Sequence, residues 1–321
     1  MLVLIFTYAL PYARFVKPAR RAAPLNISQV CRRWREVALT VPVLWASLSV
    51  YATRDDLDYA GLMRMWLARS QRYRLYVNFI AWKNLDLCSS RACLEELMRP
   101  EILTRLSDLR VSGVMEALLP LENLGAQASS LRRLVVQTYD LCLEDAYLDL
   151  SRASAAPLLA EFPVNILETP SLFFPLKGIL AGPTTHLVFS GDFYYDHFTV
   201  LGEFGAHLVS CELYLHPFSA CGALTLPRVQ TLTVGCRIVW AFLDNLTAPC
   251  LRTLQIGMSR ENRLPEVDDM SLSNMIRRSR CPLESLLMEE GSLSDADIAE
   301  AQRLCPDLHI TLAGRLWDYT W

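Results

Sequence analysis

The sequence is poor in glycine and lacks the short motifs on which many enzyme classes depend. Only 13 of its 321 residues are glycine. It contains no glycine-rich phosphate loop, no G-x-S-x-G nucleophile elbow and no H-E-x-x-H metal pair. We therefore expect a protein that catalyses no reaction and needs no cofactor.

Strong net charge and long apolar runs are also missing. The 31 basic and 34 acidic residues give a net charge of -3, which provides no overall attraction to nucleic acid or anionic membranes. The apolar run from Met1 to Leu10 is too short to span a bilayer, and it lacks the positive start of a signal peptide. We expect no nucleic-acid partner, no membrane partner and no secretion.

Cysteine is present, but not in a pattern typical of disulfides or zinc fingers. The ten cysteines are scattered from Cys31 to Cys305, and no C-x-x-C pair occurs among them. Several replace a leucine in an apolar pattern, and a free thiol behaves as a small buried hydrophobe. Reduced thiols favour a cytoplasmic or nuclear protein.

The most informative segment runs from Ile27 to Trp45 and reads ISQVCRRWREVALTVPVLW. Its apolar residues follow the three-four spacing of a helix with one buried face. Pro42 disfavours helical dihedrals at Val41, so we expect this helix to end near Leu39 or Thr40. A Leu44-Trp45 pair follows the proline.

At these residues the sequence resembles the second half of an F-box, through VCRRWREVA followed by a proline and LW. The resemblance implies a short all-α module that binds the Skp-family adaptor of an SCF-type cullin-RING ubiquitin ligase. The implied adaptor-binding or motif-core residues are Leu4, Ile5, Phe6, Val30, Cys31, Trp34, Val37, Leu44 and Trp45. The leucine-proline pair and acidic residue that usually open the motif do not precede Leu2 to Pro11. We therefore expect either weakened adaptor affinity or a different true start of the chain.

A second pattern recurs after Tyr73: two apolar residues three positions apart, then a third two positions on. The regular copies are Leu106-Leu109-Val111, Leu131-Leu134-Val136, Leu159-Phe162-Val164, Leu208-Cys211-Leu213, Val229-Leu232-Val234, Leu251-Leu254-Ile256 and Leu283-Leu286-Met288. Poorer copies begin at Thr184 and Leu308, and successive starts are 21 to 32 residues apart. Such spacing is typical of leucine-rich repeats, which must stack to bury their apolar faces.

These patterns predict an α/β repeat protein in which the all-α F-box module precedes an irregular leucine-rich-repeat-like solenoid. The expected divisions are 1–50 for the F-box-like module, 51–72 for a connecting helix and 73–321 for the repeats. A β-sandwich or an α/β globule with similar strand spacing is the alternative.

Two clusters in the second half of the chain are candidate binding sites. His186, His197, His207, Cys211, His216 and Cys221 include residue types that bind zinc, but their spacing is looser than in a zinc finger, so we expect no metal site. The aromatic residues Phe193, Tyr194, Tyr195 and Phe198 are candidates for substrate binding because such side chains anchor partners. Packing against a neighbouring repeat is their more ordinary role.

The leading hypothesis is a non-catalytic substrate-recognition subunit of an SCF-type ligase. Its F-box would dock the Skp-family adaptor, its repeats would bind a protein substrate, and other cullin-RING subunits would transfer ubiquitin. The first alternative is a leucine-rich-repeat interaction protein with a decayed F-box and no ligase role. The second is a metal-binding protein that uses the cluster from His186 to Cys221.

Overall fold

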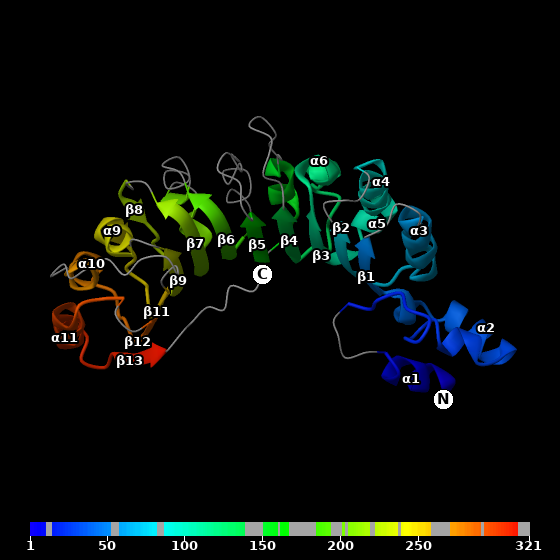
Figure 1. Cartoon of the computed structure of the whole chain (residues 1–321), viewed down its shortest axis with the longest axis horizontal. Helices are drawn as coiled ribbons and strands as arrows, with labels where there is room; N and C mark the ends of the chain where they lie inside the picture. The colour runs from blue at the N-terminus through cyan, green and yellow to red at the C-terminus, as the bar shows by residue number, and fades with distance from the viewer. Residues whose placement is uncertain are drawn as a thin grey trace. The chain divides into compact units, whose positions relative to one another are not determined.

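The computed structural model describes residues 1–10, 15–52, 58–81, 87–138, 150–159, 161–166, 184–193, 201–202, 205–218, 222–236, 239–257, 270–289 and 292–313. The chain divides into two compact units. Figure 1 labels the helices and strands of both. Unit 1 comprises Met1–Glu161 and Leu172–Pro183, and unit 2 comprises Phe162–Ser171 and Thr184–Trp321. Strand β5 (Glu161–Ile166) spans the sequence boundary between them.

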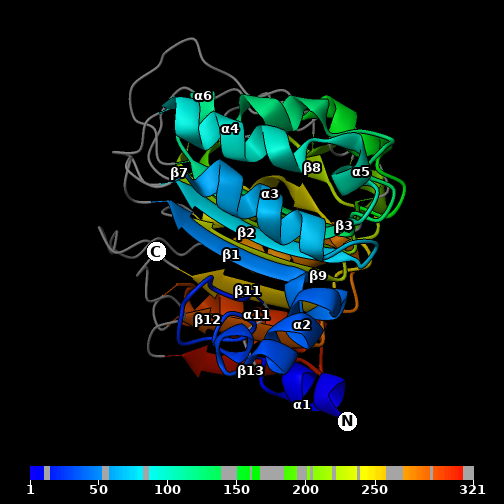
Figure 2. The ribbon, with the colours of Figure 1, turned by 90° about the vertical axis from the view of Figure 1, so that its right-hand side faces the viewer.

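Unit 1 contains a sheet of four parallel strands that pair in chain order. The strands are β1 (Ser47–Ala52), β2 (Leu75–Ala81), β3 (Leu106–Gly113) and β4 (Arg133–Thr138). Helices α3 (Tyr59–Arg69) and α4 (Leu87–Leu97) make the first two crossovers and lie side by side on one face of the sheet (Figure 2). Parallel strands need such crossovers, because a tight hairpin can join only antiparallel strands.

Short helical segments complete the described part of unit 1. They are α1 (Leu2–Tyr8), η1 (Ile27–Gln29), α2 (Arg32–Thr40), η2 (Pro42–Trp45), α5 (Pro100–Leu103), α6 (Met115–Leu118), η3 (Leu119–Asn123) and η4 (Ser151–Ala155). None of the described helices of the chain combines the length and apolar character needed to cross a membrane.

Unit 2 contains a second parallel sheet, of six strands that also pair in chain order. The strands are β6 (His186–Phe193), β7 (Ser210–Phe218), β9 (Thr231–Cys236), β11 (Thr253–Gly257), β12 (Ser285–Glu289) and β13 (His309–Ala313). The crossovers include η5 (Gly205–His207), α9 (Val239–Asn245), α10 (Ser271–Ser279) and α11 (Asp295–Leu304). Two-residue strands β8 (Leu224–Thr225) and β10 (Leu246–Thr247) form a separate small parallel pair.

The last two apolar residues of each regular copy of the pattern lie in a strand, namely β3, β4, β5, β7, β9, β11 or β12. In β11, for example, Leu254 and Ile256 are buried, and they pair in register with Leu232 and Val234 of β9. Cys211 replaces a leucine at the same level of β7 and is fully buried. Alternate residues of a strand point to the same face, so the pattern marks the face that the helices cover.

The predicted fold class is nevertheless wrong. The described chain is an α/β protein with parallel sheets of four and six strands, not an all-α F-box followed by a leucine-rich-repeat solenoid. In β3 seven of the eight residues are buried, including the charged Asp108, so both faces of this strand are covered. Burial on both faces is typical of α/β sheets.

The expectation of a separate all-α module is wrong for a second reason. Residues of this segment pack on the sheet of unit 1 and on its helix α3. Ser49 of the edge strand β1 donates its backbone N–H to the Val16 carbonyl at 2.7 Å, and the Val16 N–H bonds Ser47 Oγ at 3.2 Å. Trp45 packs edge-on against Trp66 of α3, with ring centroids 4.7 Å apart. The N-terminal segment thus protects an open sheet edge, which would otherwise present unpaired backbone groups.

The helix expected from Ile27 to Leu39 is also interrupted. It separates into η1 and α2, because Cys31 has an extended backbone with φ -157° and ψ 170°. Cys31 is the N-cap of α2, and its sulfur accepts the Trp34 N–H at 3.5 Å. The helix ends at Thr40, and Pro42 begins η2.

Candidate functional site

The first candidate site is the surface formed by the N-terminal helices. Phe6 on α1 is fully buried, and its ring lies 5.0 Å from that of Trp34 on α2. Trp45 is also fully buried and donates its indole N–H to the Ala38 carbonyl at 2.8 Å. These contacts fix α1 and α2 to each other and to the rest of unit 1.

Several apolar side chains of this segment face solvent. Leu4 is 64 % exposed, Ile5 47 % and Val30 61 %, and Val3 and Tyr8 on α1 are exposed as well. Isolated exposed apolar residues are common and need no explanation, whereas a group of them is a candidate interaction surface. We call Leu4, Ile5 and Val30 the N-terminal apolar surface.

The nine residues implied by the F-box resemblance therefore fall into three groups by exposure. Exposed residues are Leu4, Ile5, Val30 and Cys31, half-buried ones are Trp34 and Val37, and buried ones are Phe6, Leu44 and Trp45. The buried group supports the local structure, and only the other two groups are accessible to a partner.

Charged residues lie beside the apolar ones on α2. Arg32, Arg33 and Arg35 are exposed. Arg32 pairs with Glu36 one turn later at 2.9 Å, and Arg35 donates to the Ser28 carbonyl at 2.9 Å. The surroundings of the N-terminal apolar surface are thus basic, which favours a partner with acidic residues around an apolar contact.

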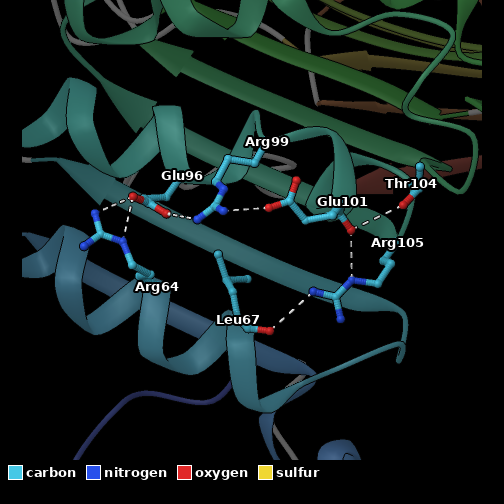
Figure 3. Close-up of polar contacts among 7 residues, drawn as sticks. All are labelled: Arg64, Leu67, Glu96, Arg99, Glu101, Thr104 and Arg105. Atoms are coloured by element: carbon cyan, nitrogen blue, oxygen red, sulfur yellow. Dashed lines mark hydrogen bonds and ion pairs between the residues drawn. The ribbon is translucent and has the colours of Figure 1, made fainter.

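The second candidate site is a pocket of about 500 Å³ lined by residues of α3, α4 and α5 and of the segments that follow α3 and α5. Its charged lining residues are Arg64, Arg72, Glu96, Arg99, Glu101 and Arg105. Figure 3 shows how five of these, all except Arg72, form a chain of ion pairs and hydrogen bonds across the helices. We call this cavity the arginine pocket.

Glu96 is the centre of the arginine pocket. Its Oε1 accepts from Arg64 Nε at 2.9 Å and Nη2 at 2.5 Å, and its Oε2 accepts from Arg99 Nη1 at 3.1 Å. The Glu96 side chain is 13 % exposed. The hydrogen bond from Arg64, together with the nearby Arg99, lowers the pKa of Glu96 below its ordinary value, so this carboxylate stays ionised.

Arg105 lines the pocket and is held by hydrogen bonds, most of them to backbone carbonyls. It donates to the Glu101 carbonyl at 3.2 Å, to Ser70 Oγ at 3.2 Å and to the Leu67 carbonyl at 3.3 Å. The Leu67 carbonyl belongs to the last turn of α3, where helix carbonyls lack partners within the helix. Burial lowers the pKa of Arg105 from its ordinary value, but an arginine remains charged at neutral pH.

The sequence-based candidates in unit 2 lie only partly within the described residues. His186 and His207 are exposed and Cys211 is fully buried, while only the backbone of His216 is described. His197 and Cys221 lie outside the described residues. Within the described part of the chain, no three His, Cys, Asp or Glu side chains group as metal ligands would.

The aromatic candidates cannot be joined into a surface. Phe193 is the last residue of β6 and is in register with Phe218 of β7. Tyr194, Tyr195 and Phe198 lie outside the described residues. Substrate binding by these four residues stays a prediction.

The arginine pocket has no signature in the local sequence. Its main ion pair joins Arg64 to Glu96, which are 32 positions apart, so no local motif marks it. A partial signal is present in the segment from Glu95 to Glu101, where Glu96, Arg99 and Glu101 alternate in charge. Such alternation is usually a solvated helix face, and only the fold shows that α3 lies against it.

No protein-family model matches the chain, and no curated protein matches it either.

Proposed function

We propose that this protein is a non-catalytic recognition subunit that docks a Skp-family adaptor through its N-terminal apolar surface. The adaptor would connect it to the other subunits of an SCF-type cullin-RING ubiquitin ligase, which carry out ubiquitin transfer. The remainder of the chain would bind the protein substrate. The proposal places the protein in the cytoplasm or nucleus, where such ligases act.

The observation that carries this proposal is the exposure of Leu4, Ile5 and Val30. The same segment holds Phe6, Leu44 and Trp45 in a buried core, so its apolar residues are divided between internal support and an outward surface. Transfer of a large aliphatic side chain from water into an interface is favourable by about 1.5–3 kcal/mol. The resemblance of Val30 to Trp45 to the F-box motif supplies the identity of the adaptor.

The test is adaptor binding by the double variant Leu4→Asp/Val30→Asp. Isothermal titration of the full chain with a purified Skp-family adaptor should show a dissociation constant at least about 100-fold weaker for the variant, because two apolar contacts are lost and two carboxylates must be desolvated. Both side chains are exposed, so the melting temperature should change little.

Leu87→Asp is the matched control. Leu87 is an exposed leucine, at 46 %, at the start of α4 and outside the N-terminal apolar surface. This variant should bind the adaptor like the wild type. If the folded wild-type chain fails to bind the adaptor, or if the control weakens binding as much as the double variant does, the proposal is wrong.

A second candidate function is partner binding without a ligase role. It is motivated by the burial of Phe6, Leu44 and Trp45, three of the residues that the F-box resemblance assigns to adaptor binding or to the motif core. In that case the N-terminal apolar surface would bind a different protein. Lack of adaptor binding by a folded wild-type chain would favour this candidate, and adaptor binding at micromolar or tighter affinity would exclude it.

A further inference from the structure

We propose that the arginine pocket binds the phosphate group of a small phosphomonoester. Four arginines and two glutamates line the cavity, which leaves two more positive than negative charges there. A phosphomonoester carries a charge of about -1.5 to -2 at pH 7 and offers three acceptor oxygens. Its charge and its acceptors therefore complement the lining.

The guanidinium groups retain donors for a ligand. Arg64 uses its Nε and Nη2 on one oxygen of Glu96, and Arg99 uses one N–H on Glu96 and one on Glu101. Because a guanidinium has five N–H donors, each of these arginines keeps others available. The Arg64 side chain is 60 % exposed and that of Arg99 50 % exposed, so these donors can be reached from solvent.

Arg72 is the cation best placed to respond to a ligand. It lines the pocket and is exposed, and within the described part of the chain its side chain makes no hydrogen bond or ion pair. All five of its donors are therefore free, and its charge is not offset by a local carboxylate. A paired arginine must share its charge, whereas Arg72 can give a bidentate contact to phosphate.

The other arginines are held in place before a ligand arrives. Glu96 fixes Arg64 and Arg99, and the Arg105 guanidinium is fixed by two backbone carbonyls and the Ser70 hydroxyl. Donors that are already oriented lose less side-chain entropy on binding. The pocket thus combines cations held by hydrogen bonds with the exposed Arg72, which has no hydrogen-bond partner among the described residues.

The dimensions and the apolar lining favour a small ester over free phosphate. A volume of about 500 Å³ lies within the range of small-molecule sites. Leu67, Ala68 and Ile102 also line the cavity and can contact a carbon group attached to the phosphate. Inorganic phosphate would leave these apolar contacts unmade.

The test measures binding of phenyl phosphate, inorganic phosphate and phenol to the full chain by isothermal titration. Phenyl phosphate should bind at least about threefold more tightly than inorganic phosphate, and phenol, which has no charge, should not bind measurably. Equal affinities for the two phosphates would overturn the assignment to an ester. Absence of phenyl phosphate binding at millimolar concentration would overturn the site.

Variants locate the binding within the molecule. Arg72→Gln should weaken phenyl phosphate at least about tenfold, since charged hydrogen bonds are lost, and should leave the melting temperature unchanged. The control is Arg91→Gln on α4, which removes an exposed arginine paired with Glu95 and does not line the pocket. Equal weakening by the two variants would show nonspecific charge attraction and contradict the proposal. Neither variant alters the N-terminal apolar surface, so adaptor binding is tested separately.

Discussion

The two units join neighbouring helices in different ways. In unit 2 the interface between α10 and α11, which we call a seam, is held by Asp297, a fully buried carboxylate. It accepts the backbone N–H of Leu272 at 2.8 Å and that of Ser273 at 2.9 Å, and also bonds the Ser273 hydroxyl. In unit 1 the seam between α3 and α4 is made by Glu96 with Arg64, a pair that reaches solvent.

This difference separates a structural seam from one that can bind a ligand. The Asp297 oxygens are used on the first turn of α10, where N–H groups lack partners within the helix, and the other charged contact there pairs Arg277 with Glu300. The unit 1 seam instead holds several arginines around a cavity. Mutations in the first seam should therefore change stability, and mutations in the second should mainly change binding.

The largest stability effect is expected for Asp297→Ala. The change leaves two buried backbone N–H groups without their acceptor and removes one of the two partners of the buried Ser273 hydroxyl, so we expect a loss of about 2–4 kcal/mol in the free energy of unfolding, measured by urea denaturation. Asp295→Ala, an exposed residue in the first turn of the same helix, should cost no more than about 0.5 kcal/mol. Similar losses for the two variants would contradict the role given to the buried carboxylate.

The next largest stability effect is expected for an arginine contact that occurs in both units. Arg278 donates to the Leu243 carbonyl at 2.7 Å and to the Leu246 carbonyl, as Arg105 donates to the Leu67 carbonyl in unit 1. Arg278 thus satisfies carbonyls at and just after the end of α9, and Arg105 satisfies one in the last turn of α3.

Replacing either arginine by methionine keeps much of the volume but removes the hydrogen bonds. We expect Arg278→Met and Arg105→Met each to lower the free energy of unfolding by about 1–2 kcal/mol. Chemical denaturation of both variants beside the wild type measures the two losses. An effect in one variant and none in the other would show that the two arginines are not equivalent.

The smallest effect is a pH dependence centred on Glu300 in α11. Arg303 first, and Arg277 second, lower the pKa of Glu300 to about 2. A carboxyl whose pKa is lowered by folding stabilises the protein above its unfolded value near 4.5, and this contribution is lost as the pH falls toward 2. The melting temperature of Glu300→Gln should therefore be below that of the wild type at pH 6, and the difference should shrink as the pH falls to 3. A difference that stays constant over this range would contradict the ionic origin.

Local patterns predicted the strands at the regular copies of the apolar pattern and the end of α2 just before Pro42, because each depends on residues close in sequence. Ser294 caps α11 by accepting the N–H of Asp297, three residues along the chain, at 3.1 Å, and such a local contact has a sequence signature. The use of the Asp297 side chain on α10 was not predicted, since it joins residues about 25 positions apart.

Local patterns likewise could not predict the fold class or the candidate sites, because both depend on contacts between residues far apart in sequence. The apolar pattern located the buried face of β3, but it gave no indication that Asp108 on the other face is buried too. At the N-terminus, apolar spacing placed Val30 and Ile27 on one buried face, whereas Ile27 is buried and Val30 is exposed. The break at Cys31 turns the two halves of that segment in different directions, and periodicity assumes a continuous helix.

The central claim is that the N-terminal apolar surface of unit 1 docks the adaptor. Hydrogen exchange of the full chain with and without the purified Skp-family adaptor tests it most directly. Bound adaptor should slow amide exchange in residues 2–8 and 27–34 and leave α9, α10 and α11 of unit 2 unchanged. Exchange that is unaltered in both N-terminal segments at saturating adaptor, or slowed only in unit 2, would contradict the account.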